Sequence, residues 1–295
     1  MHLKPKKGLG QNFLFDKNIQ RKLVTAYNLK ATDQVLEIGA GYGGLTKLIA
    51  HNVAFVYALE IDTELSKVLK DNITGYSNIE IINQDILKFN LKRYFGRFKN
   101  GAPPRLKTGV PSGTESRPAL IRGLKAAVLW RRDKIKVVGN IPYYITTPII
   151  EHLLEYPDMV ETIYITVQKE FAKRIAANPG SKKYGSFSCF VQYYSIPKIL
   201  FCIKKNSFSP MPKVDSCLLE LKIRQSPALK VKDEKLFFKV IRASFNKRRK
   251  TLRNSLDGIV PLEKLGEFFK KYGININIRP EDLTLKDFAC LANII

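Results

Sequence analysis

The segment Asn140–Tyr143 (NIPY) follows an apolar run and combines an amide, a proline and an aromatic ring. The side-chain carbonyl of Asn140 and the backbone carbonyl of Ile141 can accept the two hydrogens of an aromatic amine, which aims the nitrogen lone pair at an activated methyl group. Pro142 stiffens the turn, and Tyr143 offers a face for a flipped base, at about 1–3 kcal/mol of stacking. Holding the two reactants about 3–3.5 Å apart would then supply most of the catalysis.

A glycine-rich turn follows the apolar run 34–38. Its glycines, Gly39, Gly41 and Gly44, have the spacing Gly-x-Gly-x-x-Gly, which lets a ligand approach the backbone at the start of a helix. Glu60, 21 residues after the first glycine, could accept hydrogen bonds from ribose hydroxyls. The same spacing serves dinucleotide cofactors, and a tight turn without any ligand is a further interpretation. The glycines alone therefore do not identify the cofactor.

Asp85 follows a third apolar run, 79–84, and could accept a hydrogen bond from an adenine amino group. On its own, a turn-starting aspartate is an equally good interpretation. Ligands of open α/β sheets, however, bind along the edge where the carboxyl ends of parallel strands meet. Because Glu60, Asp85 and Asn140 would all lie on that edge, we interpret NIPY as the Asp/Asn/Ser-x-Pro-Tyr/Phe pattern of enzymes that methylate exocyclic amines, rather than as an ordinary turn.

Strand-like and helical patterns alternate along the chain, which predicts a parallel sheet covered by helices on both faces. The predicted strands are 34–38, 53–60, 79–84, 134–139 and 160–168, followed by 198–203 and 216–223. A helix is predicted before the first strand, at 17–29 with Asp16 as N-cap, and further helices between the strands at 44–50, 63–72, 148–155 and 169–177. The proline-rich stretch FSPMPK joins the last two strands and indicates an antiparallel edge.

From about residue 227 only helices are predicted, at 235–245, 262–272 and 285–294. We therefore predict an α/β domain over residues 1–226, with a mostly parallel sheet and an antiparallel edge, and a small all-α domain over 227–295. Residues 96–133 interrupt the step from the third to the fourth strand, where a connection is usually short. The Pro, Gly and Ser content of this segment and its lack of apolar periodicity predict a disordered, basic insertion.

The charge balance points to a polyanionic partner. The chain has 50 Lys and Arg against 26 Asp and Glu, a formal net charge of +24, and nucleic acid would explain such an excess. An acidic membrane surface is the alternative, but no basic amphipathic helix with a lipid-facing stripe is evident. No apolar run reaches transmembrane length, and the basic N-terminus lacks a signal core. We expect no membrane association and a cytoplasmic protein.

Cysteine and histidine spacings indicate neither a metal site nor a disulfide framework. The four cysteines (Cys189, Cys202, Cys217 and Cys290) lack CxxC spacing and lie in apolar runs, so we expect buried, reduced thiols. The three histidines are scattered, and no metal is expected.

Taken in order, the motifs resemble the KsgA-type (RsmA) ribosomal RNA adenine dimethyltransferases, relatives of the Erm methyltransferases that confer macrolide resistance. The resemblance covers nearly everything except 96–133, through LGQNFLFD (9–16), EIGAG, LEID, QDIL, GNIPY, VQKEFAKRI, NPGSKKYGSFS, FSPMPKVDS, FNKRRKTLRNSL (245–256) and RPEDLT. It implies a Rossmann-like domain that uses S-adenosylmethionine. It also implies dimethylation of two adjacent adenines in the 3′-terminal hairpin of small-subunit rRNA, by a monomer acting late in ribosome biogenesis on a pre-ribosomal particle.

The resemblance implies site roles as well. The methyl donor would be held by Asn12, Leu14, Gly39, Gly41, Glu60, Asp85 and Asn140. Glu60 would bind its ribose and Asp85 its adenine amine. Asn140 would lie between donor and target, in the motif with Pro142. Phe208 would sandwich the target base against Tyr143, with a core phenylalanine as the alternative interpretation.

A basic cluster near the start of the all-α domain would contact the RNA backbone. It consists of Lys247, Arg248, Arg249, Lys250 and Arg253, and a solvated helix face is the alternative. This segment and RPEDLT resemble the KsgA branch rather than the Erm branch, which acts on large-subunit rRNA.

Two further hypotheses remain. One is a ribosome-assembly protein without catalysis, which a degraded NIPY motif would indicate, whereas the motif here is intact. The other is an NAD-dependent oxidoreductase, which would explain the glycines but neither NIPY nor the charge.

Overall fold

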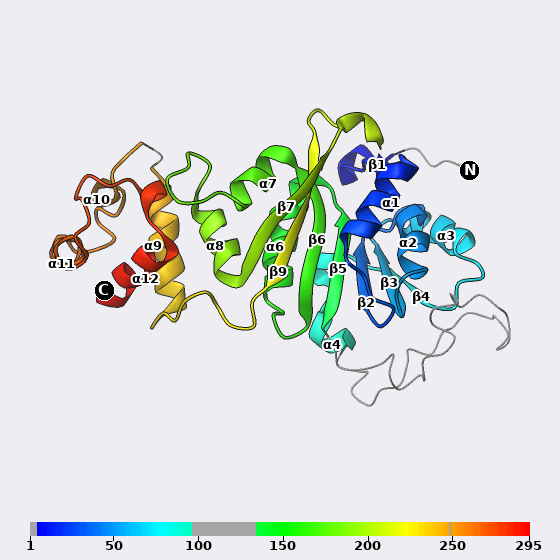
Figure 1. Cartoon of the computed structure of the whole chain (residues 1–295), viewed down its shortest axis with the longest axis horizontal. Coiled ribbons are helices and arrows are strands. Elements are labelled where there is room, and N and C mark those ends of the chain that lie inside the picture. The colour runs from blue at the N-terminus through cyan, green and yellow to red at the C-terminus, as the bar shows by residue number, and fades with distance from the viewer. Residues whose placement is uncertain (1–4, 96–133, 248) are drawn as a thin grey trace. The chain divides into compact units, whose positions relative to one another are not determined.

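The computed structural model describes residues 5–95, 134–247 and 249–295 (Figure 1). The predicted insertion and Arg248 lie outside these residues. Contacts divide the chain into two compact units, Met1–Lys169 with Ile199–Ile223, and Glu170–Lys198 with Arg224–Ile295. The contact division therefore groups residues 170–198 with the C-terminal helices, whereas a single boundary at residue 227 places them in the α/β domain. That boundary stays a prediction.

A seven-stranded sheet with the order β4-β3-β2-β5-β6-β9-β7 forms the centre of the fold (Figure 1). Its strands are β2 (Gln34–Ile38), β3 (Phe55–Glu60), β4 (Ile79–Asn83), β5 (Ile135–Asn140), β6 (Val160–Gln168), β7 (Ser195–Ile203) and β9 (Ser216–Ile223). The strands from β4 to β6 are parallel, and β9 pairs antiparallel with β6. The predicted fold class, a mostly parallel sheet with an antiparallel edge, is confirmed.

The central strands are apolar on both faces because helices cover both sides of a parallel sheet. Every residue of β3 is buried, as are four of the five residues of β2. Helices α1 (Lys17–Ala26), α2 (Gly44–Ala50) and α3 (Thr63–Asn72) share one core cluster with the sheet, through residues such as Leu23, Ile49, Leu69 and Val56. Asp16 caps α1 as predicted, accepting hydrogen bonds from the backbone of Asn18 and Ile19.

Three further short elements precede β5 or follow it within the first unit. These are the 3-10 turn η2 (Ile86–Lys88), α4 (Leu91–Phe95) and α6 (Thr146–Leu154).

A second, two-stranded sheet was not predicted. In it, β1 (Phe13–Leu14) pairs antiparallel with β8 (Phe208–Ser209), which ties the N-terminal segment to the loop before β9.

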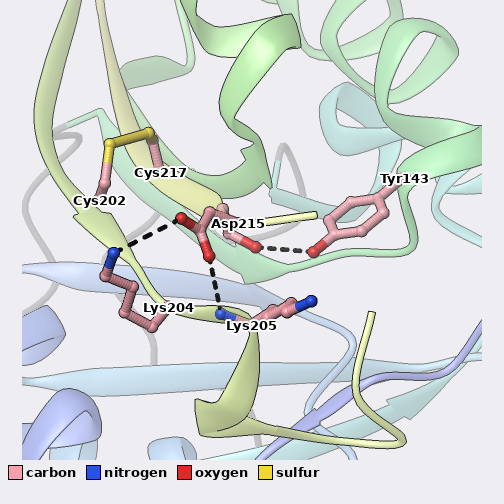
Figure 2. The surroundings of a disulfide bond; sticks show 7 residues. Tyr143, Cys202, Lys204, Lys205, Asp215 and Cys217 are labelled. Carbon is pink, nitrogen blue, oxygen red and sulfur yellow. Dashed lines mark hydrogen bonds and ion pairs between the residues drawn. A yellow bond between two sulfur atoms is a disulfide. The ribbon is translucent and has the colours of Figure 1, made fainter. Parts of the chain in front are cut away.

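A disulfide joins Cys202 of β7 to Cys217 of β9, two neighbouring strands (Figure 2). The expectation of four reduced thiols is therefore wrong for this pair. Sequence spacing concealed it, because the two cysteines meet only through strand pairing. Cys189 and Cys290 are free. Cys189 is buried as expected, whereas Cys290 is half-buried and Cys202 is exposed, contrary to the expectation.

The second unit is mainly helical. Its helices are α7 (Lys169–Ile175), which starts at the unit boundary, α8 (Ser186–Tyr194), α9 (Glu234–Phe245), α10 (Leu252–Ser255), α11 (Leu262–Tyr272) and α12 (Leu285–Ile294). Phe237, Phe268 and Phe288 lie at its core, each with no exposed surface. The three predicted C-terminal helices are confirmed. Across the described parts of both units, no helix is long and apolar enough to cross a membrane.

Candidate active site

A cavity of about 750 Å³ opens in the first unit, at the carboxyl ends of β2, β3, β4 and β5. Its size suits a nucleoside-sized ligand with room for part of a second one. Nine residues predicted from the sequence line it: Asn12, Leu14, Gly39, Gly41, Glu60, Asp85, Asn140, Pro142 and Tyr143. The structure thus brings together residues that are up to 131 positions apart in the chain, from Asn12 to Tyr143.

The glycine-rich turn lets a ligand approach the backbone along one wall of the cavity. Gly39 and Gly41 have φ angles of 75° and 56°, which residues with a side chain rarely adopt. A Cβ atom at Gly41 would lie 3.4 Å from the ring of Phe13, and the Gly39 N–H is fixed by a 2.8 Å hydrogen bond to the carbonyl of Leu59. Substitution would therefore strain the turn and narrow the approach to the backbone.

Glu60 ends β3 with its carboxylate anchored at two points. Oε2 accepts a hydrogen bond from the Gly41 N–H and Oε1 accepts one from the Asp62 N–H, both at 2.9 Å. Burial raises the pKa of Glu60, and these N–H donors oppose that effect. Because a carboxylate has about four acceptor positions, roughly two stay available to a ligand such as a ribose diol.

Glu37 is a residue of this cavity that the sequence analysis missed. It lies on β2, is only 2% exposed and lines the cavity. Its Oε2 has no hydrogen-bond partner among the described residues. Burial raises the pKa of Glu37 to about 8; the Thr46 hydroxyl opposes this shift, and the nearby charge of Glu60 adds to it. The available signal was an acidic residue two positions before the first glycine of the turn.

Asp85 completes a group of three acidic residues around the cavity. Its Oδ1 accepts a 2.9 Å hydrogen bond from the Leu87 N–H at the start of η2, which leaves Oδ2 as the second acceptor. Together with Glu60 and with Glu37, which can ionise when a cation binds, it gives the cavity three acidic groups in a chain with a net charge of +24. The arrangement suits a cationic ligand.

Asn140 is oriented by the N-terminal segment. Its Nδ2 donates a 2.9 Å hydrogen bond to the backbone carbonyl of Asn12. Asn12 in turn donates through its own amide to the carbonyl of Gly10, at 3.2 Å, and is followed directly by β1. Since the amino group of Asn140 is bound in this way, Oδ1 is the atom of its side chain that serves as an acceptor.

The ring of Tyr143 is positioned by a hydrogen bond to the first residue of β9. Its hydroxyl lies 2.7 Å from Oγ of Ser216, which is fully buried, and burial raises the pKa of Tyr143 (Figure 2). Asp215, next in the chain, accepts a 3.1 Å hydrogen bond from the Lys205 N–H, and its carbonyl accepts one from Lys169 at 3.0 Å. These bonds fix the strand end that supports the ring.

Phe208 does not line the cavity. It is 3% exposed and packs in the core cluster with Leu23, Tyr27 and Tyr164, which agrees with the alternative interpretation of a core ring. Only its neighbour Ser209 reaches the cavity. In this arrangement the Phe208 ring has no exposed face for a base, so the sandwich with Tyr143 stays a prediction.

The predicted RNA-contacting residues belong to the second unit. Lys247, Arg249, Lys250 and Arg253 are all exposed, in the turn between α9 and α10 and on α10 itself. A short turn holds the first of them, since the Lys250 N–H donates to the Lys247 carbonyl at 2.9 Å. Four of the five residues thus form one exposed basic cluster; Arg248 is outside the described residues. Within the described ranges, no group of three or more His, Cys, Asp or Glu could hold a metal ion.

Comparison with known proteins agrees with this geometry. The family model for ribosomal RNA adenine dimethylases matches residues 2–295. A ribosomal RNA small subunit methyltransferase A from Streptococcus sanguinis is 40% identical, over 98% of this chain and 91% of the relative, and one from Streptococcus gordonii is 41% identical over the same shares. The chain therefore belongs to the ribosomal RNA adenine dimethylase family, which confirms the KsgA-type resemblance and excludes the oxidoreductase hypothesis.

Solved structures show the same fold. A dimethyladenosine transferase from Plasmodium falciparum superposes with a TM-score of 0.70, at 23% identity over 95% of each chain. The 23S rRNA methyltransferase ErmE superposes with a TM-score of 0.67, at 22% identity over 96% of this chain and 99% of the other. The Rossmann-like methyltransferase fold is thereby confirmed, and the protein is an rRNA adenine dimethyltransferase.

Proposed function

We propose that the cavity binds S-adenosylmethionine beside a flipped adenine of small-subunit rRNA, and that Asn140 and Ile141 accept the hydrogens of its exocyclic amine. The observation that carries the proposal is the 2.9 Å hydrogen bond from Asn140 Nδ2 to the Asn12 carbonyl. It leaves Oδ1 as the acceptor in a cavity that also contains the acidic residues expected around a cationic donor.

The cavity fits the proposed donor in charge and shape. S-adenosylmethionine supplies an activated methyl group and carries positive charge on its sulfonium and ammonium groups. Glu37, whose Oε2 is buried without a partner, would compensate that charge near the glycine turn. Glu60 would accept the ribose hydroxyls and Asp85 Oδ2 the adenine amine, while Asn12 and Leu14 close the cavity from the N-terminal side.

The chain contributes positioning more than acid–base chemistry. Oδ1 of Asn140 and the carbonyl of Ile141 would accept hydrogen bonds from the amine, which localises its lone pair on the nitrogen instead of in the adenine ring. Pro142 would keep the turn rigid. Tyr143, fixed by Ser216, would stack on the target base. After methyl transfer the nitrogen is cationic and strongly acidic, so its proton is lost without a dedicated base. Positioning of this kind accounts for much of a transfer barrier.

The substrate follows from the family and the charge distribution. We infer two adjacent adenines in the 3′-terminal hairpin of small-subunit rRNA, dimethylated late in biogenesis within a pre-ribosomal particle by a monomer. The small-subunit methyltransferase relatives and the exposed basic cluster support this substrate. We place the reaction in the cytoplasm, since the relatives are ribosomal RNA methyltransferases.

Replacing Asn140 with alanine tests the proposal. Asn140→Ala should bind S-adenosylmethionine within a few-fold of wild type but lose nearly all transfer, roughly 10³-fold or more, because its carbonyl acts mainly in the transition state. Calorimetry with the donor and a radiolabel transfer assay on small subunits that lack the modification measure the two effects. Asn52→Ala, an exposed change in the same unit, is the matched control.

Near wild-type transfer by Asn140→Ala would refute the assignment. The non-catalytic assembly hypothesis would instead require that the wild-type protein itself binds small subunits without methylating them.

A further inference from the structure

Two consecutive tyrosines of the NIPYY segment have opposite environments. Tyr143 is half-buried and bound to Ser216, whereas Tyr144 is 64% exposed, although both line the same cavity. They lie in the 3-10 turn η4 (Tyr143–Ile145). With three residues per turn, neighbouring side chains diverge by about 120°, so the two rings point in different directions.

The ring of Tyr144 has a defined position in spite of its exposure. A Cβ atom built on Gly10 would lie 3.0 Å from its Cε1 and 3.1 Å from its Cδ1, so the ring packs directly on a glycine backbone. Gly10 has a φ of 57°, and its carbonyl accepts the hydrogen bond from Asn12. One side of the ring is therefore supported by the segment that orients Asn140, and the rest faces solvent at the rim of the cavity.

We propose that Tyr144 stacks on the nucleobase adjacent to the target adenine. This inference rests on the proposed function. When the target adenine flips into the cavity, its neighbour loses a stacking partner, and an aromatic ring held at the rim can replace it. Stacking of a base on an aromatic side chain is worth about 1–3 kcal/mol and tolerates any base, since every base has an aromatic face. Tyr144 thus positions the RNA strand beside the reacting base.

Substitutions at Tyr144 give the first test. Tyr144→Ala should raise the RNA KM by about 5- to 150-fold, the equivalent of the stacking energy. Donor affinity, measured in parallel because Tyr144 lines the cavity, should change by no more than about twofold. Tyr144→Phe and Tyr144→Trp should stay close to wild type, because each keeps an aromatic face. Met211→Ala is the matched control, since Met211 is 60% exposed in the same unit and does not line the cavity.

Substrates that lack the flanking base give the decisive test. Small subunits would be reconstituted with rRNA whose ligated synthetic 3′ segment keeps one of the two adjacent adenines as the target and carries an abasic nucleotide on its 5′ or its 3′ side. At one of these positions, wild type and Tyr144→Ala should have the same KM, because no base remains to stack. An equal loss for Tyr144→Ala on intact and on both abasic substrates would overturn the proposal, as would no loss on the intact substrate.

These results are distinguishable from a failure of the proposed function. If wild type methylated no adenine of the intact small subunit, the proposed function would be wrong. If wild type were active and Tyr144→Ala were equally active, only the role of Tyr144 would be refuted.

Discussion

The cavity of the first unit and the basic cluster of the second unit differ in both charge and burial. Around the cavity, Glu37 and Glu60 are almost fully buried and acidic, whereas Lys247 and Arg249 are exposed and basic. A buried carboxylate acts strongly on a single small ligand because water screens it little. A single exposed cation contributes little binding energy, but the contributions of several cations sum along a polyanion. The two regions are thus suited to a small cation and to an RNA backbone, respectively.

The comparison predicts that the two regions can be damaged separately, with the largest effect in the cavity. Glu60→Ala should weaken S-adenosylmethionine binding about 10- to 150-fold, since hydrogen bonds to a charged group are worth about 1.5–3 kcal/mol. Affinity for small subunits should stay within twofold. Calorimetry with the donor and filter binding of small subunits measure both quantities.

Controls separate this effect from misfolding. The N–H groups of Gly41 and Asp62 lose their acceptor in Glu60→Ala, so thermal unfolding is followed in parallel, and Glu60→Gln keeps an acceptor for one of them. Glu161→Ala removes an exposed carboxylate of the same unit and should change nothing. Unchanged donor affinity in both Glu60 variants would exclude this residue from the donor site.

The features that sequence predicted well depend on local patterns. Strand ends and helix starts follow from apolar runs, glycines and caps, so β2, α2 and α3 have the predicted bounds. Nine of the ten predicted residues of the catalytic and donor sites reach the cavity because they flank such elements.

The features that sequence did not predict depend on tertiary pairing. The β1–β8 ladder joins Phe13 to Ser209, and the disulfide joins two strands that are neighbours only in the sheet. Helix α8 (SFSCFVQYY) is made of apolar and small residues apart from Gln192, so its pattern has no clear polar face and periodicity did not reveal it. Phe208 shows the same limit, because its motif resembles that of a stacking ring, whereas the burial of the ring depends on tertiary packing.

A second, smaller effect is expected in the basic cluster. The log–log dependence of small-subunit affinity on salt has a slope of about −0.7 to −0.9 per phosphate contact. Replacing Arg249 and Arg253 together with glutamine should flatten that slope by about one to two units and lower affinity roughly tenfold near 0.1 M salt. Donor affinity should not change.

The control for this prediction removes the same charge elsewhere in the same unit. Lys270 and Lys271 lie in the last turn of α11, and replacing both with glutamine should leave the slope nearly unaltered. If the two double variants behaved alike, the basic cluster would be an ordinary solvated surface rather than an RNA contact.

The last expected effect is a pH dependence of donor binding, which originates in Glu37. Burial raises the pKa of Glu37 to about 8 in the free protein, so the carboxyl is mostly protonated at pH 7. A cationic donor favours the ionised form, and binding at pH 7 should therefore release a proton. Donor affinity should rise as pH increases from 6 to 8, by at most about tenfold per unit, and level off above the free-protein pKa.

Glu37→Gln isolates this effect, because an amide of the same shape cannot ionise. The variant should bind the donor more weakly at pH 8 and show no rise in affinity between pH 6 and 8. Its folding stability should also change relative to wild type. A carboxyl whose pKa is higher in the folded state than in the unfolded state loses stability as pH rises through that interval, so Glu37→Gln should gain stability relative to wild type between about pH 5 and 8. Calorimetry in buffers of different ionisation enthalpy counts the released protons, and a wild-type value near zero at pH 7 would show that Glu37 does not ionise when the donor binds.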